Sequence, residues 1–175
     1  YLAAFGVRAG VASARSDPFG LPRVEILARD AGWRFRAKVA FPRLALHELF
    51  ERQAAATPDA VALIFEGERL SYQELNRRAN QLAHFLHALG LRRGARVGIC
   101  LERTPEMIAG LLGILKAGAA YLPLDPEYPK ERLVFLLADA EPEMVVTSQP
   151  LLENLPECEV QVVCLDAESE SISLE

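Results

Sequence analysis

The chain has 175 residues, of which 51% are hydrophobic and 25% are charged, and its formal net charge is −5. This composition fits one core-bearing domain or part of a larger one, and no apolar run reaches the roughly 18 residues that a membrane span needs. The cysteines Cys100, Cys158 and Cys164 form no CxxC pair, which predicts reduced thiols of a cytoplasmic protein rather than a disulfide framework or a metal site.

The first 42 residues show one interpretable pattern. Residues 33–39 alternate aromatic or apolar residues with cations, which is typical of a half-buried strand with cations on its solvent face. Nucleic-acid binding is the alternative interpretation, but a single basic strand is a weak footprint, and we expect no nucleic-acid partner. Residues 1–42 are therefore left unassigned, as a linker or an aberrant N-terminal segment.

A helix and a hairpin are predicted next. Apolar residues at helical spacing predict a helix over residues 44–56, which ends before Pro58 because the residue preceding a proline disfavours the helical region. A β-rich run follows at residues 61–65. The Glu-Gly-Glu turn behind it returns the chain over residues 69–72, which predicts a β-hairpin.

A second helix is predicted to begin at a capping box. Ser71 and Glu74 have the spacing at which the serine hydroxyl accepts from the Glu74 backbone N–H and the glutamate carboxylate returns to the Ser71 N–H. One apolar stripe continues to Leu89, and Gly90 ends the helix in the usual C-terminal position.

From residue 96 onward, strands alternate with helices. Short connections between alternating strands and helices predict a parallel sheet of right-handed βαβ units flanked by helices, so the predicted fold class is α/β. The acidic end, residues 167–175, is expected to be a solvated loop or a frayed terminus. The expected strands are residues 96–101, 119–124 (as a buried strand), 144–147 and 160–165.

The stretch LKAGAAYLPLDP, residues 115–126, predicts a tight corner between a helix and a strand. Gly118 permits a left-handed exit from the helix, while Pro123 and Pro126 remove ladder donors and predict a strand that is either short, or bulged and near an edge. Asp125 lies where a parallel strand ends, the place where α/β folds bind ligands. Lys116 is expected to be a solvated lysine with a packed stem.

A search for reactive motifs assigns no catalytic, cofactor-binding or metal-binding residue. Gly113 and Gly118 have P-loop spacing, but two alanines replace the Lys-[Ser/Thr] pair, and neither G-x-G-x-x-G nor G-x-S-x-G occurs. His84 and His87 lie on one helix face without a nearby third ligand for zinc.

Two segments resemble core motifs of nonribosomal peptide synthetase adenylation domains, in the adenylate-forming, AMP-binding superfamily that also holds acyl-CoA ligases and luciferases. LSYQEL, residues 70–75, resembles the first motif, and residues 115–126 resemble the second. The resemblance runs from residue 46 to about residue 166. It implies that residues 43–175 are the N-terminal portion of such a domain, with an incomplete first subdomain of the adenylate-forming fold.

A complete member of that family uses ATP and Mg²⁺ to convert an amino acid to an aminoacyl-AMP, and then transfers it to the phosphopantetheine thiol of a carrier domain. Its partners are the rest of the adenylation domain and the neighbouring condensation and carrier domains. The family's phosphate loop, hinge and C-terminal lysine are not found in this sequence, so we expect the chain alone to bind no cofactor and to be inactive. An acyl-CoA or aryl-acid ligase fragment and a non-catalytic scaffold remnant are the alternatives.

Overall fold

The structure is a computed structural model that describes residues 45–157 and 159–173. The chain divides into two compact units, Tyr1–Leu44 and Ala45–Glu175, and all described residues lie in the second. The strand expected at residues 33–39 and the thiol of Cys158 lie outside the described residues. The assignment of residues 1–42 stays a prediction.

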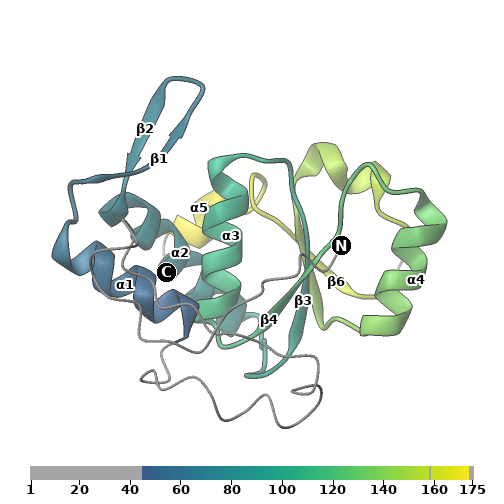
Figure 1. The fold of residues 1–175 in the computed structure, drawn as a ribbon. Helices are drawn as coiled ribbons and strands as arrows, with labels where there is room; N and C mark the ends of the chain where they lie inside the picture. The colour runs from purple at the N-terminus through teal and green to yellow at the C-terminus, as the bar shows by residue number, and fades with distance from the viewer. Residues whose placement is uncertain (1–44, 158, 174–175) are drawn as a thin grey trace, which may run out of the picture. The chain divides into compact units, whose positions relative to one another are not determined.

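A four-stranded parallel sheet forms the centre of the described unit, as the sequence predicted (Figure 1). Its strand order is β4-β3-β5-β6, so the chain crosses β3 when it passes from β4 to β5. The strands are β3 (Arg96–Cys100), β4 (Ala120–Pro123), β5 (Met144–Thr147) and β6 (Gln161–Cys164). The helices of the unit are α1 (Leu46–Ala56), α2 (Tyr72–Ala88), α3 (Pro105–Lys116), α4 (Lys130–Ala140), the 3₁₀ helix η3 (Gln149–Asn154) and α5 (Ser169–Ser173).

Helices cover both faces of this sheet because alternate residues of each strand point to opposite faces. On one face, Val97, Ile99 and Val146 pack in one cluster with Leu86 of α2 and Ile114 of α3. On the other face, Cys100 and Val145 pack with Leu133 and Leu137 of α4 and with Leu155. Figure 1 shows α3 on one side of the sheet and α4 on the other.

The predicted hairpin is confirmed as the antiparallel pair β1 (Val61–Phe65) and β2 (Glu68–Ser71), which projects from the rest of the unit (Figure 1). Its turn places Glu66 and Gly67 at positive φ, 50° and 88°. Two residues with positive φ match the type I′ turn that joins two-residue hairpins. Where the hairpin meets the body, Leu63 and Leu70 pack against a third cluster between α2 and α3.

Strand β4 corrects one expectation and confirms another. It was predicted as buried, but Ala120, Tyr121 and Pro123 are exposed, because β4 is the edge strand of the sheet and lacks a neighbour on one side. β4 has four residues and lies at the edge of the sheet, and both features agree with the prediction of a short or near-edge strand, since a proline lacks the N–H that a further neighbouring strand would need.

The acidic C-terminal segment is also more ordered than expected. Residues 169–173 form α5, which lies against α2, and the Gln81 side-chain amide donates to the Ser173 carbonyl at 2.9 Å. Ile172 packs against the main core cluster. The expectation of a solvated loop was wrong here because the isolated apolar Ile172 supplies an anchor that the overall acidity of the segment hides.

Lys116 departs most from the sequence-based interpretation. Its side chain is only 5% exposed, and its ammonium contacts the Glu51 carboxylate of α1 and the Asn76 Oδ1 of α2, the latter at 2.9 Å. Lys116 is therefore not a solvated lysine. It joins the C-terminal end of α3 to both α1 and α2.

Gly118 leaves α3 in the left-handed conformation that the sequence predicted, with φ of +75°. A Cβ at this position would lie 3.3 Å from Nε of Arg93. We expect Gly118→Ala to lower the free energy of unfolding by about 1 kcal/mol, because positive φ strains a residue with a Cβ. Urea unfolding of the chain measures this. Gly118→Asn is the matched control and should cost less, since asparagine tolerates this region; equal midpoints for all three chains would contradict the left-handed cap.

The start of α2 contains half of the predicted capping box. The Ser71 hydroxyl accepts from the Glu74 backbone N–H at 3.2 Å, but the Glu74 carboxylate is engaged by Arg77 at 2.7 Å and by Arg78 at 2.8 Å. Hydrogen bonds from Arg77, opposed by burial and helped by Arg78, lower the pKa of Glu74 from 4.5 to about 2.

This carboxylate predicts an acid-dependent contribution to stability. Because the pKa of Glu74 is lower in the folded state, its contribution is complete above about pH 4.5 and is lost as the pH falls towards about 2. Glu74→Gln should therefore unfold at lower urea than the parent near neutral pH, and the two midpoints should converge in acid. The effect is modest because the Glu74 side chain is 32% exposed. Arg77→Met in the Glu74→Gln background should cause little further loss of stability, because the carboxylate that Arg77 binds is already gone. A difference between the urea midpoints of the parent and Glu74→Gln that stays the same at every pH would contradict the interpretation.

Candidate functional site

The carboxyl edge of the parallel sheet carries a hollow of about 710 Å³. Strand β3 leads through α3 to β4 on one side, whereas β5 leads through η3 to β6 on the other side. Neighbouring strands whose connections diverge in this way open a crevice at their carboxyl ends, and α/β folds bind ligands there. The fold therefore makes this hollow the candidate functional site.

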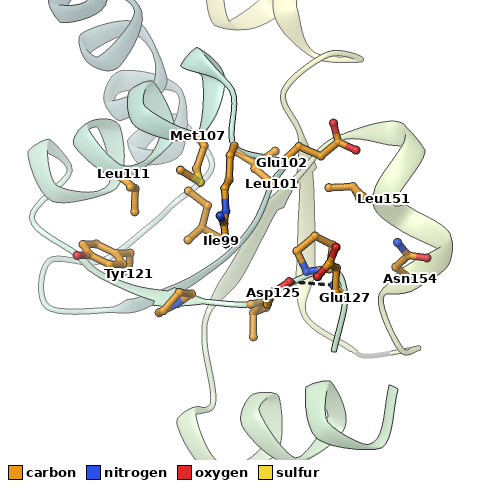
Figure 2. A pocket seen from close by; sticks show the side chains of 14 residues that line it. Ile99, Leu101, Glu102, Met107, Leu111, Tyr121, Asp125, Glu127, Leu151 and Asn154 are labelled. Atoms are coloured by element: carbon orange, nitrogen blue, oxygen red, sulfur yellow. Dashed lines mark hydrogen bonds between the residues drawn. The ribbon is translucent and has the colours of Figure 1, made fainter. Parts of the chain in front are cut away.

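The hollow has an apolar floor and a polar rim (Figure 2). Tyr121 of β4 lies at one end and Asn154 of η3 at the other, with the acidic side chains near the middle (Figure 2). The floor consists of Ile99, Leu101, Met107, Leu111 and Leu151, and the charged rim consists of Glu102, Arg103, Asp125 and Glu127.

Asp125 lies in this hollow, as its position after a parallel strand predicted. Its Oδ1 accepts the Glu127 backbone N–H at 2.9 Å, and its carbonyl accepts the Tyr128 N–H at 3.0 Å. These bonds hold the turn that leads into α4, so Asp125 has a structural task that needs no ligand.

The chemistry of the hollow does not fit the phosphates of a nucleotide. Its rim carries three carboxylates and one guanidinium, a balance that repels anions. Within residues 45–157 and 159–173, no group of three or more His, Cys, Asp or Glu could hold a metal ion. The hollow can take apolar or neutral groups between its floor and rim.

A second hollow of about 630 Å³ lies between α2, α3 and α5. The two arginines in its lining, Arg77 and Arg78, are paired with Glu74, and Arg78 also lies 3.6 Å from Glu106. Its Asp166 accepts the Gln149 backbone N–H at 3.0 Å and so ties the start of η3 to the loop after β6. Arg77, Arg78 and Asp166 of this hollow are thus engaged in contacts that hold the fold together.

The remaining residues considered from the sequence are spread over the unit. His84 and His87 are exposed on α2. Cys100 and Cys164 are free thiols in β3 and β6, as expected, and burial raises the pKa of both thiols. Fully buried Cys100 is thus a packed, weakly reactive thiol of the core.

The geometry defines an α/β protein with a crevice at the topological switch point of its parallel sheet, and comparison with known proteins gives its family. The profile of the family described as AMP-binding enzyme matches residues 50–174. The chain belongs to this family and represents the N-terminal part of a nonribosomal peptide synthetase adenylation domain.

A linear gramicidin synthase from Brevibacillus parabrevis is 51% identical over 125 residues, which make up 71% of this chain and 2% of that protein. The nonribosomal peptide synthetase FmoA3 in its α-methyl-L-serine-AMP-bound form has a TM-score of 0.68 at 38% identity, over 73% of this chain and 15% of that one. The NpsA N-terminal subdomain from Klebsiella oxytoca, in complex with anthranilyl-AMSN, has a TM-score of 0.66 at 26% identity, over 75% of this chain and 32% of that one. The chain thus spans a small part of the relatives it matches.

Among the helices of the described residues, none combines the length and apolarity that crossing a membrane requires.

Proposed function

We propose that this chain is part of an enzyme that activates an amino acid with ATP and Mg²⁺, forming an aminoacyl-AMP and releasing pyrophosphate. The observation that carries the proposal is 51% identity over 125 residues to a linear gramicidin synthase. The activated amino acid would pass to the phosphopantetheine thiol of a carrier domain. The partners are the rest of the adenylation domain and neighbouring condensation and carrier domains, in the cytoplasm.

An aryl-acid substrate is the second candidate, because a solved relative is an NpsA subdomain in complex with anthranilyl-AMSN. That relative is 26% identical, whereas the FmoA3 structure with α-methyl-L-serine-AMP bound is 38% identical. The higher identity to FmoA3 favours an amino acid.

We also propose that residues 45–173 supply architecture and no catalytic residue. The acidic rim of the first hollow repels phosphates, and Arg77 and Arg78 in the second hollow are paired with Glu74. Charge stabilisation of a transferring phosphoryl group needs aligned donors and cations, which the family resemblance assigns to segments outside this sequence.

Amino-acid-dependent ATP–pyrophosphate exchange tests the function in two steps. The chain alone should show no exchange above a no-protein control with any of the twenty amino acids. A chimera, in which residues 46–166 replace the aligned segment of the matching adenylation domain of the linear gramicidin synthase, should exchange. Exchange by the chain alone would contradict the architectural role. A folded chimera without exchange would favour the scaffold alternative.

A further inference from the structure

An apolar trough lies between α1, α3 and β4, on the side of the unit away from α4. It contains a hollow of about 490 Å³, and the residues lining it within the described part of the chain carry no charge. Three of its side chains are well exposed: Leu46 is 63%, Leu49 is 50% and Tyr121 is 41% exposed. The trough is defined by Leu46, Leu49, Phe50, Leu111, Leu115 and Tyr121.

Helix α1 is held in place in a way that leaves its leucines outward. The buried ammonium of Lys116 binds Glu51, and the buried residue of this helix is Ala54, which is 5% exposed. A buried charge is costly unless it is paired, so its use here fixes the position of α1. Leu46 and Leu49 are therefore held in a fixed position along one side of the trough, although they contribute little to the core of the described unit.

The absence of charge from the lining, within the residues that the structure describes, indicates the kind of partner. Transient interfaces and contacts between moving domains are comparatively polar, whereas permanent interfaces resemble a domain core cut in half. The trough is lined on one side by α1 and on the other by α3 and β4, and both sides have the uncharged character of a permanent interface. A permanent neighbour fits the trough better than a flanking domain that moves during a reaction cycle.

The comparisons indicate where such a neighbour could come from. The region similar to this chain makes up 32% of the NpsA N-terminal subdomain. Most of that one subdomain therefore lies outside the matched region, although it folds together with it.

We propose that the trough is the surface on which the rest of an adenylation subdomain packs as a permanent apolar interface. This inference rests on the proposed function, because it takes its occupant from the same synthetase. Another part of this chain and a second copy of it are the competing occupants.

Cysteine labelling compares two residues of equal exposure. Leu49 in the trough and Val134 on α4 are both 50% exposed. We would introduce Leu49→Cys or Val134→Cys into the chain and into the chimera, and measure maleimide labelling at each position by mass spectrometry, which separates these sites from the native cysteines. In the chain alone both cysteines should react at similar rates. In the chimera Leu49→Cys should react at least about tenfold more slowly, and Val134→Cys should be unchanged.

Each contrary outcome has a defined meaning. Equal labelling of both positions in the chimera would overturn the proposal. Protection of Leu49→Cys in the chain alone would also overturn it, because another part of this chain or a second copy would then be the occupant. Should the chimera fail to fold, the same cysteine pair at the aligned positions of the linear gramicidin synthase adenylation domain gives the same comparison. ATP–pyrophosphate exchange by the chimera is measured separately. If the chimera exchanges but Leu49→Cys is not protected from labelling, only the proposal about the trough is refuted. If Leu49→Cys is protected but the chimera does not exchange, only the proposed function is refuted.

Discussion

Gly113→Val is expected to lower the free energy of unfolding by about 3 kcal/mol, the upper end of what overpacking a well-packed core costs. A Cβ at Gly113 would lie 2.9 Å from Cδ2 and 3.0 Å from both Cβ and Cγ of Leu82. The inner atoms of Leu82 cannot swing away, so α2 and α3 would have to separate. Because Met107 and Leu111 of α3 form part of the floor of the candidate site, the same change should also deform that hollow.

Urea unfolding of the 175-residue chain measures this effect, and Gly110 provides a matched control on the same helix. A Cβ at Gly110 would meet only the tips of Ile99 and Leu101, at 3.0 and 3.4 Å. Those side-chain ends can move, and alanine has the better helix propensity, so Gly110→Ala should change stability by less than about 1 kcal/mol. If Gly113→Val unfolds at the same urea concentration as Gly110→Ala, the two helices do not pack as closely as described.

The parallel sheet could be predicted because its signals are local. Apolar runs at residues 96–101 and 119–124, separated by the helical periodicity of residues 105–116, are enough to indicate βαβ units. The position of a strand within the sheet is not local. An apolar run such as that of β4 is compatible with a central strand and with an edge strand, and only Pro123 and Pro126 indicated the edge position that the structure shows.

The sequence placed one residue, Asp125, at the candidate site, but it did not predict which other residues form its walls. Asp125 follows a strand, so its place at the carboxyl edge followed from a parallel sheet. The other walls come from Met107 on α3 and from Leu151 and Asn154 on η3, which different crossover connections bring together. No local pattern in the sequence links these three residues.

Lys116 was misinterpreted although a signal was present. It follows Ala109, Leu112 and Gly113 by seven, four and three residues, so helical periodicity places it on the buried stripe of α3. The charge of a lysine alone does not place its side chain in solvent when its position lies on a buried stripe. Its partners, Glu51 and Asn76, lie on two other helices and could not be identified from the local sequence.

Lys116→Ala is accordingly expected to lower the free energy of unfolding by about 2 kcal/mol, within the range for a lost hydrogen bond to a charged group. The change removes a packed stem and leaves Oδ1 of partly buried Asn76 without the ammonium that now lies 2.9 Å away. The loss should stay below the roughly 3–5 kcal/mol of a fully buried ion pair, because the side chain of Glu51 is 44% exposed and keeps its hydration.

Two further variants separate the charge from the packing and the buried site from an ordinary lysine. Lys116→Met keeps most of the stem and should recover part of the loss, whereas Lys130→Ala, at an exposed position of α4, should change stability by less than about 0.5 kcal/mol. Without the lysine, α1 should also open locally, so trypsin should cleave at Arg52 within α1 faster than in the parent chain. Equal unfolding midpoints for Lys116→Ala and Lys130→Ala, with unchanged cleavage at Arg52, would show that Lys116 is solvated after all and that α1 is held by its apolar contacts alone.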